Sequence, residues 1–243
     1  MTPDTNCPEL ERQFIAAGCD GMVAVHAASR TKTFKGQDSS CLKIHGSTDS
    51  ARREEFTAGR MLAQQCLLSL GQQPTPIGRG VDREPLWPKQ TVGSITHTDT
   101  FAAAVVWMPD IKLWPVCIGI DAEHFGRLSN DDWPTVFTDQ EIKALNQKKL
   151  SDRDQLATYM FSAKEAVYKT QFPLTRRFIE FNEVSVSIQF PGRENCHQGR
   201  LLIEHDIKEL APFHFSVFYY CLESIVITGA VALPKSICLQ NGN

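Results

Sequence analysis

Long apolar stretches are absent from this sequence. The longest apolar runs, residues 101–108 and 225–233, fall far short of the ~20 residues that a membrane-spanning helix needs. The N-terminal residues include acidic side chains and no apolar segment, which argues against a secretory signal. We therefore expect a cytoplasmic protein without a transmembrane segment.

A marked excess of charge of either sign is also absent. The chain has 25 Lys and Arg against 28 Asp and Glu, which gives a net charge of −3 and a pI near 6.2. It also lacks the stripe of aromatic and basic residues that binds nucleic acid by stacking and charge. We therefore expect no nucleic-acid partner.

The eight cysteines show neither C-x-x-C nor zinc-finger spacing. Such scattered cysteines indicate reduced thiols in a cytosolic protein rather than a disulfide framework. With 243 residues, 42% of them hydrophobic and 22% charged, the chain can bury a sizeable core as one large domain or two small ones.

The pattern of apolar residues predicts an α/β (α+β) protein. Strands are expected at residues 21–27, 92–97, 101–107, 116–121, 184–190, 200–205, 213–219 and 224–233. Helices are expected at residues 50–70 and 138–149, and from Ser151, taken as the N-cap, to a stop at Pro173. A loop is expected at residues 36–50 and a frayed tail at residues 240–243.

The best candidate boundary lies at residues 108–115, where two prolines separate two apolar strands. Each side carries a helix and several strands. We therefore predict an N-terminal half, residues 1–115, and a C-terminal half, residues 116–243.

Residues 118–123, IGIDAE, place two carboxylates directly after an apolar run. In a strand, Asp121 and Glu123 point to the same face with Cα atoms roughly 7 Å apart. Two such carboxylates can bind a hard cation such as Mg²⁺, and without one they need a positive neighbour. The alternative is a strand end that meets solvent.

Residues 161–169, FSAKEAVYK, have helical periodicity and add a third carboxylate. Glu165 and Lys169 are four residues apart and share one face of the helix. They form either a solvated ion pair or a third metal ligand beside a lysine that binds phosphate.

Together these motifs resemble the 4′-phosphopantetheinyl transferases. The resemblance rests on G-I-D-x-E followed by aromatic-x-x-K-E-A-x-x-K. It extends to R-R-x-E-F-x-x-G-R from residue 52, R-x-P-x-W-P from residue 83 and S-I-T-H at residues 94–97, which are similar to the enterobactin-synthase component D branch.

The resemblance implies a fold and an activity. The fold would be a pseudo-two-fold pair of α/β halves with the active site in the cleft between them. The enzyme would be a monomer that uses Mg²⁺ and transfers 4′-phosphopantetheine from coenzyme A to a serine of an apo carrier protein, releasing 3′,5′-ADP. The carrier could be peptidyl, aryl or acyl, in siderophore or other nonribosomal peptide synthesis.

The resemblance also implies residue roles. Asp121, Glu123 and Glu165 would bind the metal, and Asp121 and Lys169 would also lie against coenzyme A. Glu165 would take the serine proton, and Lys169 would stabilise charge on the pyrophosphate. The remaining coenzyme A phosphate contacts would come from Arg53, Arg60, Arg83, Ser94 and His97, with the arginine that holds the 3′-phosphate left open.

Two other classes of function remain open from the sequence. A Mg²⁺-dependent phosphodiesterase or nuclease could use the same acids and lysine, although the charge pattern argues against it. A non-catalytic coenzyme A-binding protein would have no use for three carboxylates and a lysine.

Overall fold

A computed structural model describes residues 5–20, 22–29, 50–73, 75–189 and 197–238. They divide into two compact units, Met1–Ile111 and Lys112–Asn243. The expected loop at residues 36–50, apart from Ser50, and the expected tail at residues 240–243 lie outside the described residues. The pseudo-two-fold relation between the halves stays a prediction.

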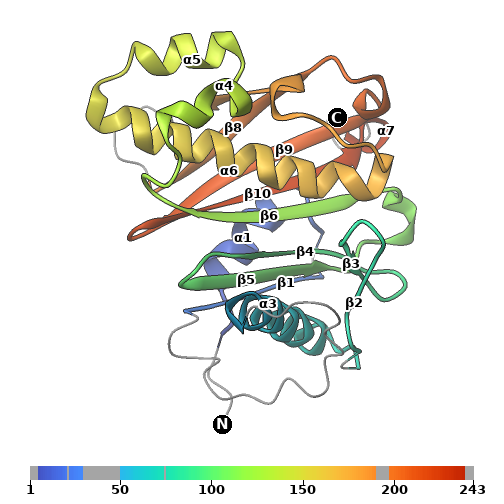
Figure 1. Cartoon of the computed structure of the whole chain (residues 1–243). Helices are drawn as coiled ribbons and strands as arrows, with labels where there is room; N and C mark the ends of the chain where they lie inside the picture. Colours follow the sequence, from blue (N-terminus) through green and yellow to red (C-terminus); the bar gives the residue numbers. More distant parts are fainter. Residues whose placement is uncertain (1–4, 21, 30–49, 74, 190–196, 239–243) are drawn as a thin grey trace. The chain divides into compact units, whose positions relative to one another are not determined.

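Unit 1 is built on a three-stranded antiparallel sheet in the order β1-β5-β4 (Figure 1). Its strands are β1 (Val23–Ser29), β4 (Val92–His97) and β5 (Phe101–Trp107). Its helices are α1 (Pro8–Ala16) and α3 (Ser50–Ser69), and a two-stranded hairpin joins β2 (Gly78–Arg79) to β3 (Pro85–Leu86). Helix α3 packs against all three strands of the sheet.

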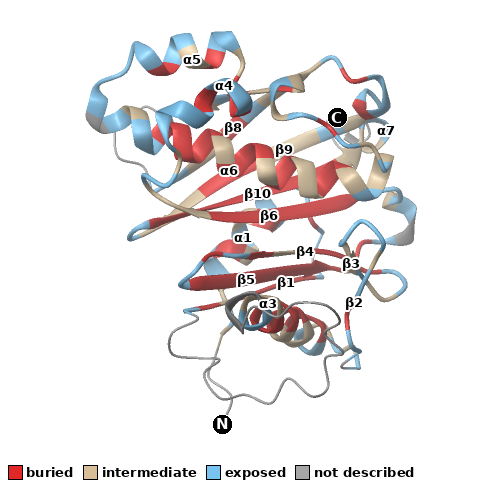
Figure 2. Ribbon diagram, in the orientation of Figure 1, coloured by how far each residue is buried: buried red, intermediate tan, exposed pale blue. Residues whose placement is uncertain are grey.

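The core of unit 1 forms where α3 meets β5. All residues of β5 are buried, as the red central strand in Figure 2 shows. Gly59 of α3 allows the helix to lie close to the neighbouring strand β4, because a Cβ there would lie 2.5 Å from Cγ2 of Ile95. On β1, His26 is buried between Thr5 and Ser69, with its ring nitrogens 2.7 Å and 2.8 Å from their hydroxyls. His26 is therefore a core histidine whose two ring nitrogens both have hydrogen-bond partners, as expected for a histidine inside an apolar strand.

Unit 2 is built on a five-stranded antiparallel sheet in the order β6-β10-β9-β8-β7. Its strands are β6 (Cys117–His124), β7 (Val184–Gln189), β8 (Gln198–His205), β9 (Phe213–Leu222) and β10 (Ile225–Pro234). Its helices are α4 (Trp133–Val136), α5 (Asp139–Asn146), α6 (Leu150–Thr175) and α7 (Lys235–Cys238). Short 3₁₀ turns lie at Ile111–Leu113, Asn130–Asp132, Phe181–Glu183 and Lys208–Leu210, the first of them across the boundary between the units.

Helix α6 lies across one face of this sheet and contacts β6, β10, β9 and β7 (Figure 1). Its closest approach is at Gly119 of β6. A Cβ at that position would lie 2.1 Å from the backbone oxygen of Ala166 and 2.3 Å from Oγ1 of Thr170. Only a residue without a side chain allows the helix to lie this close to the strand.

Three predicted helix limits are wrong. Helix α6 begins at Leu150 with Lys149 as its N-cap, so Ser151 lies inside the helix rather than at the cap position. It also continues past Pro173 to Thr175, because a proline in the last turn removes a hydrogen bond only near the helix end. Helix α5 ends at Asn146 rather than Lys149. Its predicted capping box is confirmed, since Thr138 and Glu141 accept hydrogen bonds from each other's backbone N–H groups.

The α/β (α+β) class is confirmed, because each unit packs a long helix against an antiparallel sheet. None of the described helices has both the length and the apolar character that a bilayer crossing requires. The alternating strands from residue 184 onward also form as predicted.

Candidate active site

Strand β6 presents Asp121 and Glu123 on the face that α6 covers. Gly119, two residues before Asp121, contacts α6, and side chains two apart in a strand share a face. Asp121 is 4% exposed, Glu123 is half-buried, and the intervening Ala122 is fully buried. The predicted pairing of two carboxylates on one strand face is therefore present.

Helix α6 brings Ser162, Glu165 and Lys169 to this face. These residues are spaced by three and four, so they lie along one side of the helix. The Lys169 ammonium donates to Oδ1 of Asp121 at 2.6 Å and to the backbone oxygen of Ile120 at 3.3 Å. Ser162 Oγ donates to Oδ2 of Asp121 at 2.8 Å. Both oxygens of Asp121 thus accept a hydrogen bond from the helix.

Burial and the negative charge of Asp121 raise the pKa values of Glu123 and Glu165. Burial, followed by the charge of Asp121, raises the pKa of Glu123 to about 7. Burial also raises the pKa of Glu165, with Asp121 adding to the shift and Lys169 opposing it. The protein holds more negative charge here than its own lysine compensates.

Lys169 is the positive neighbour that the two carboxylates of β6 require. Burial alone would lower the pKa of Lys169, but the charges of Asp121 and Glu165 outweigh it and raise that pKa. The Lys169 side chain is 27% exposed, and its hydrogen bonds run to the strand. The alternative of a solvated pair with Glu165 along the helix surface does not describe this geometry.

Among the described residues, no three His, Cys, Asp or Glu side chains form a ready-made metal cluster. One observation nevertheless suits a cation at Glu123. Its Oε2 is buried and has no hydrogen-bond partner within the described parts of the chain. A buried carboxylate oxygen normally has a partner, and oxygen donors are those that Mg²⁺ prefers. The residues present therefore fit a hard divalent cation, and the three-carboxylate metal site stays a prediction.

A buried ion pair fixes α6 on its other side. The Lys164 ammonium donates to Glu141 Oε2 at 2.7 Å and to the backbone oxygens of Val136 and Phe181 at 3.0 Å and 2.9 Å. Glu141 also accepts from Val186 N–H at 2.6 Å. Burial lowers the pKa of Lys164 although Glu141 opposes the shift. This pair joins α4, α5, α6 and β7 and sets the rotation of the helix that carries Glu165.

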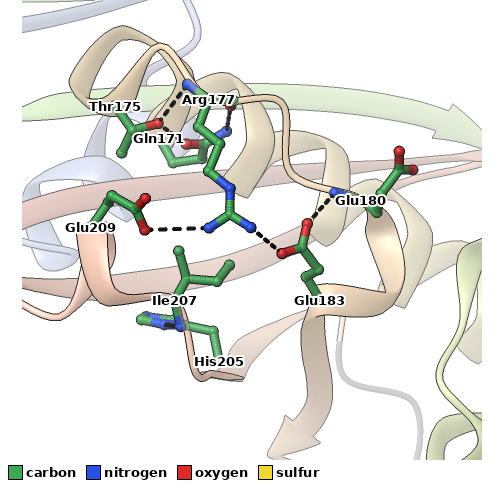
Figure 3. Close-up of polar contacts among 8 residues, drawn as sticks. All are labelled: Gln171, Thr175, Arg177, Glu180, Glu183, His205, Ile207 and Glu209. Atoms are coloured by element: carbon green, nitrogen blue, oxygen red, sulfur yellow. Dashed lines mark hydrogen bonds and ion pairs between the residues drawn. The ribbon is translucent and has the colours of Figure 1, made fainter.

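The C-terminal end of α6 is fixed by Arg177 (Figure 3). Its guanidinium pairs with Glu183, and with Glu209 at 3.2 Å, and Gln171 of α6 donates to its backbone oxygen at 3.1 Å. Figure 3 shows Arg177 reaching between the two acids. These contacts lie six or more residues from Glu165, so they stabilise the helix end rather than the site itself.

Unit 1 contains the residues that the resemblance assigns to coenzyme A. His97 ends β4, and its Nδ1 lies 3.7 Å from Glu55 Oε2 of α3. Arg53 is exposed in the first turn of α3, and Arg83 is exposed in the β2–β3 hairpin with a φ of 71°. Ser94 is buried inside β4 opposite Val105. Their contacts to a nucleotide stay predictions.

Arg60 differs from the other candidate arginines because it is buried. It is 5% exposed, stacks over Phe56 at 4.6 Å and donates to the backbone oxygen of Gly78 at 3.3 Å. Its Nε has no partner among the described residues. Burial and the nearby charge of Arg79 lower the pKa of Arg60 to about 10. A buried guanidinium beside a second one favours an anionic ligand.

Sequence reasoning missed Ser162 and Thr228 as neighbours of Asp121. Thr228 of β10 pairs with Asp121 across the sheet, and its Oγ1 lies 2.8 Å from Ser162 Oγ. Two signals were available. Ser162 precedes Lys169 by seven residues, which is two helical turns, and Thr228 is a polar residue in an otherwise apolar strand.

Comparison with family models matches both units. Residues 44–107 match the 4′-phosphopantetheinyl transferase N-terminal domain, and residues 117–228 match the 4′-phosphopantetheinyl transferase superfamily. The second match includes Asp121, Glu123, Glu165 and Lys169.

Individual relatives agree with the family models. The chain is 36% identical over 138 residues to 4′-phosphopantetheinyl transferase Npt of Nocardia iowensis and 35% identical over 138 residues to PptT of Mycobacterium tuberculosis. These alignments cover 57% of this chain and 60% and 59% of the relatives, so the chain spans less than two thirds of their length. It is 30% identical over 182 residues to enterobactin synthase component D of Escherichia coli K12, covering 73% of this chain and 76% of that protein.

Proposed function

Because this chain belongs to the 4′-phosphopantetheinyl transferase superfamily, we propose that it transfers 4′-phosphopantetheine from coenzyme A to a serine of an apo carrier protein. The other product is 3′,5′-ADP. The observation that supports this most directly is the contact of Lys169 with Asp121 beside Glu123 and Glu165, within the matched region.

The proposal includes Mg²⁺ bound by Asp121, Glu123 and Glu165. Their excess negative charge and the unpartnered Oε2 of Glu123 support it. When bound, the metal would neutralise charge on the pyrophosphate and position it for attack.

Glu165 is the proposed proton acceptor for the serine. Burial raises its pKa above the ordinary value, so its carboxylate is a stronger base than an exposed one. Lys169 lies on the same side of α6 and is partly exposed, so its ammonium is available to a phosphate oxygen. It would stabilise the negative charge that develops on the leaving pyrophosphate.

Unit 1 would supply the contacts to the coenzyme A phosphates. Arg60 is the strongest candidate for a phosphate because it is buried with an unpartnered Nε. Arg53, Arg83 and His97 are exposed and would add charge-assisted hydrogen bonds. Ser94 would contribute through the S-I-T-H segment.

The proposed partner is a carrier of nonribosomal peptide or siderophore synthesis, and the similarity to the protein named enterobactin synthase component D supports this. Peptidyl, aryl and acyl carriers all remain candidates. A cytoplasmic location is supported by the free, buried thiols of Cys19, Cys66 and Cys117, which persist in a reducing compartment. We take the active species to be a monomer.

Intact mass spectrometry tests the proposal. The chain is incubated with coenzyme A, Mg²⁺ and a panel of apo peptidyl, aryl and acyl carriers. At least one carrier should gain the mass of phosphopantetheine, and chelation of Mg²⁺ should prevent the gain. Asp121→Asn and Glu165→Gln should each reduce the rate by at least about a hundredfold, since each removes a ligand from a metal that contributes several kcal/mol.

The same preparation is tested for digestion of DNA and RNA with Mg²⁺. Digestion of nucleic acid without transfer to any carrier would overturn the proposal in favour of a nuclease. Tight binding of coenzyme A without either reaction would favour a non-catalytic binding protein.

A further inference from the structure

The two oxygens of Asp121 are held in different ways. Oδ1 accepts from Lys169, whose side chain is 27% exposed and can exchange partners with a ligand. Oδ2 accepts from Ser162, which is 0% exposed. Water cannot reach the second bond to replace it, so the orientation of the carboxylate depends on the serine.

Ser162 is itself oriented by Thr228. Thr228 is 0% exposed, donates to the backbone oxygen of Ser162 at 2.8 Å and lies 2.8 Å from Ser162 Oγ. A serine hydroxyl has a single proton. That proton goes to Asp121, so the contact between the two hydroxyls depends on the single proton of Thr228, which is shared between the backbone oxygen and the Oγ of Ser162. The two hydroxyls therefore form a chain that ends at the carboxylate.

We propose that Ser162, supported by Thr228, is a positioning residue that fixes Asp121 so that Oδ1 is presented to a divalent cation. A carboxyl group rotates in a broad, roughly two-fold well about its last side-chain bond, so holding one oxygen sets the direction of the other. Groups that hold a metal-ligating carboxylate by hydrogen bonds typically change metal affinity or activity by roughly 10–100-fold when removed. This inference rests on the metal site of the proposed function.

Thr170 provides a matched control on the same helix. It is also 0% exposed, and its hydroxyl donates to the backbone oxygen of Ala166 at 2.7 Å and contacts that of Ala230 on β10. It does not hydrogen-bond to Asp121. Thr170→Val therefore removes a buried hydroxyl of α6 without touching the carboxylate.

The test titrates Mn²⁺ alone into each protein and measures free Mn²⁺ by electron paramagnetic resonance, together with thermal melts. Ser162→Ala should weaken Mn²⁺ binding by roughly 10–100-fold. Thr228→Val should weaken it less, and Thr228→Ser, which keeps the hydroxyl, should restore it. Thr170→Val should lower the melting temperature and leave the Mn²⁺ dissociation constant unchanged.

Kinetics give a second readout. In Ser162→Ala the apparent KM for Mg²⁺ should rise by the same factor as the Mn²⁺ dissociation constant, while kcat at saturating Mg²⁺ stays within a few-fold of wild type. If Ser162→Ala and Thr228→Val bind Mn²⁺ like wild type and only melt earlier, as Thr170→Val does, the hydroxyls are purely structural and the proposal is overturned. Should Ser162→Ala fail to fold, the comparison of Thr228→Val with Thr228→Ser decides.

These outcomes are separable from failure of the proposed function. A wild-type protein that binds Mn²⁺ but modifies no carrier would refute the transfer activity. The effect of Ser162 on Mn²⁺ binding would still be decided by the same titrations.

Discussion

Asp121 and Glu123 differ in the hydrogen-bond partners that the protein gives their carboxylate oxygens. Asp121 is bonded to Lys169 and Ser162, whereas the buried Oε2 of Glu123 has no bond among the described residues. A carboxylate without a partner in a buried place resists ionisation. Its protonation should therefore be visible in the stability of the metal-free protein.

The first prediction concerns Glu123 and pH. Burial raises the pKa of Glu123 to about 7 in the folded protein, above its ordinary value of 4.5. The folded state then holds a proton that the unfolded chain releases between these two values, so Glu123 makes the protein less stable as pH rises through that window. Without divalent cations, Glu123→Gln should remove this contribution and be relatively more stable than wild type at pH 8 than at pH 5.

Thermal melts in a chelating buffer from pH 5 to pH 8 measure this effect. Glu204→Gln, an acid of β8 distant in sequence from the site, is the control. Parallel melting curves for wild type and Glu123→Gln across the range would show that Glu123 ionises normally.

The second prediction concerns Lys169. If its charge stabilises the transition state, Lys169→Met should reduce kcat by roughly 10²-fold or more with a modest change in KM for coenzyme A. Steady-state kinetics measure this, with Lys143→Met, an exposed lysine of α5, as the control. An unchanged kcat would leave Lys169 as a structural partner of Asp121 only.

At the scale of elements, the distance between α6 and β6 determines how Glu165 and Lys169 lie relative to Asp121 and Glu123. Gly119 allows the contact, and the buried pair of Lys164 and Glu141 sets the rotation of the helix. Neither feature touches the carboxylates directly. Each should nevertheless alter their geometry when changed.

The third prediction is that Gly119→Ala separates helix and strand. The new Cβ would lie 2.1 Å from the backbone oxygen of Ala166, which is too close to tolerate without movement. Overpacking of this kind destabilises by about 1–3 kcal/mol. Displacement of Glu165 and Lys169 from Asp121 by even about 1 Å should reduce kcat/KM by roughly 10²-fold.

Denaturant unfolding and kinetics on Gly119→Ala test both effects. Gly78→Ala is the control, since a Cβ there meets Leu86 at an ordinary 3.4 Å. A fully active Gly119→Ala protein would mean that the site tolerates a displaced helix.

The fourth prediction concerns the buried ion pair. Lys164 and Glu141 side chains are 1% and 5% exposed, so Lys164→Met leaves a buried carboxylate without its cation. The loss of stability should be about 3–5 kcal/mol, measured by urea unfolding. The double variant Lys164→Met/Glu141→Gln should recover part of it, because the amide oxygen still accepts from Val186 while the unpaired charge is gone. No recovery would argue that hydrogen bonds, not charge, dominate this pair.

At the scale of the whole molecule, each unit carries a different part of the proposed chemistry. Unit 2 holds the carboxylates and Lys169, and unit 1 holds the arginines and His97. Substitutions in unit 1 can therefore be tested by changing one phosphate of the proposed substrate. Coenzyme A suits this purpose because its 3′-phosphate is remote from the phosphorus under attack.

The fifth prediction compares coenzyme A with dephospho-coenzyme A. If Arg60 binds the 3′-phosphate, wild type should prefer coenzyme A and Arg60→Met should reduce this preference in kcat/KM by roughly ten- to a hundredfold, the effect of about 1.5–3 kcal/mol per charge-assisted contact. The same comparison on Arg53→Ala and Arg83→Ala shows whether another of the candidate arginines binds the 3′-phosphate instead. Equal losses for both substrates in Arg60→Met would assign it to the pyrophosphate or to the fold.

The sequence predicted the elements better than their limits or their contacts. The strand that presents Asp121 and Glu123 was predictable, because an apolar run followed by alternating acids has a period of two. The partner of Lys169 was not, since spacing along α6 identifies Glu165 as its neighbour while Asp121 comes from a strand 48 residues away. The sequence predicted an end of α6 at Pro173, but the helix continues to Thr175. A proline removes one backbone hydrogen bond, and in the last turn this loss does not prevent the helix from continuing for two more residues.

The contacts around Asp121 also have a consequence for how the chain folds. Asp121 and Ser162 are 41 residues apart, and Ser162 and Thr228 are 66 residues apart. Strand β6 hydrogen-bonds within its sheet to β10, which follows the other strands in the part of the chain that the structure describes. A growing polypeptide cannot assemble this constellation until β10 has left the ribosome, and long-range pairings of this kind form slowly. The charged cluster is therefore assembled only when unit 2 is nearly finished, so a chain that ends before β10 lacks these contacts.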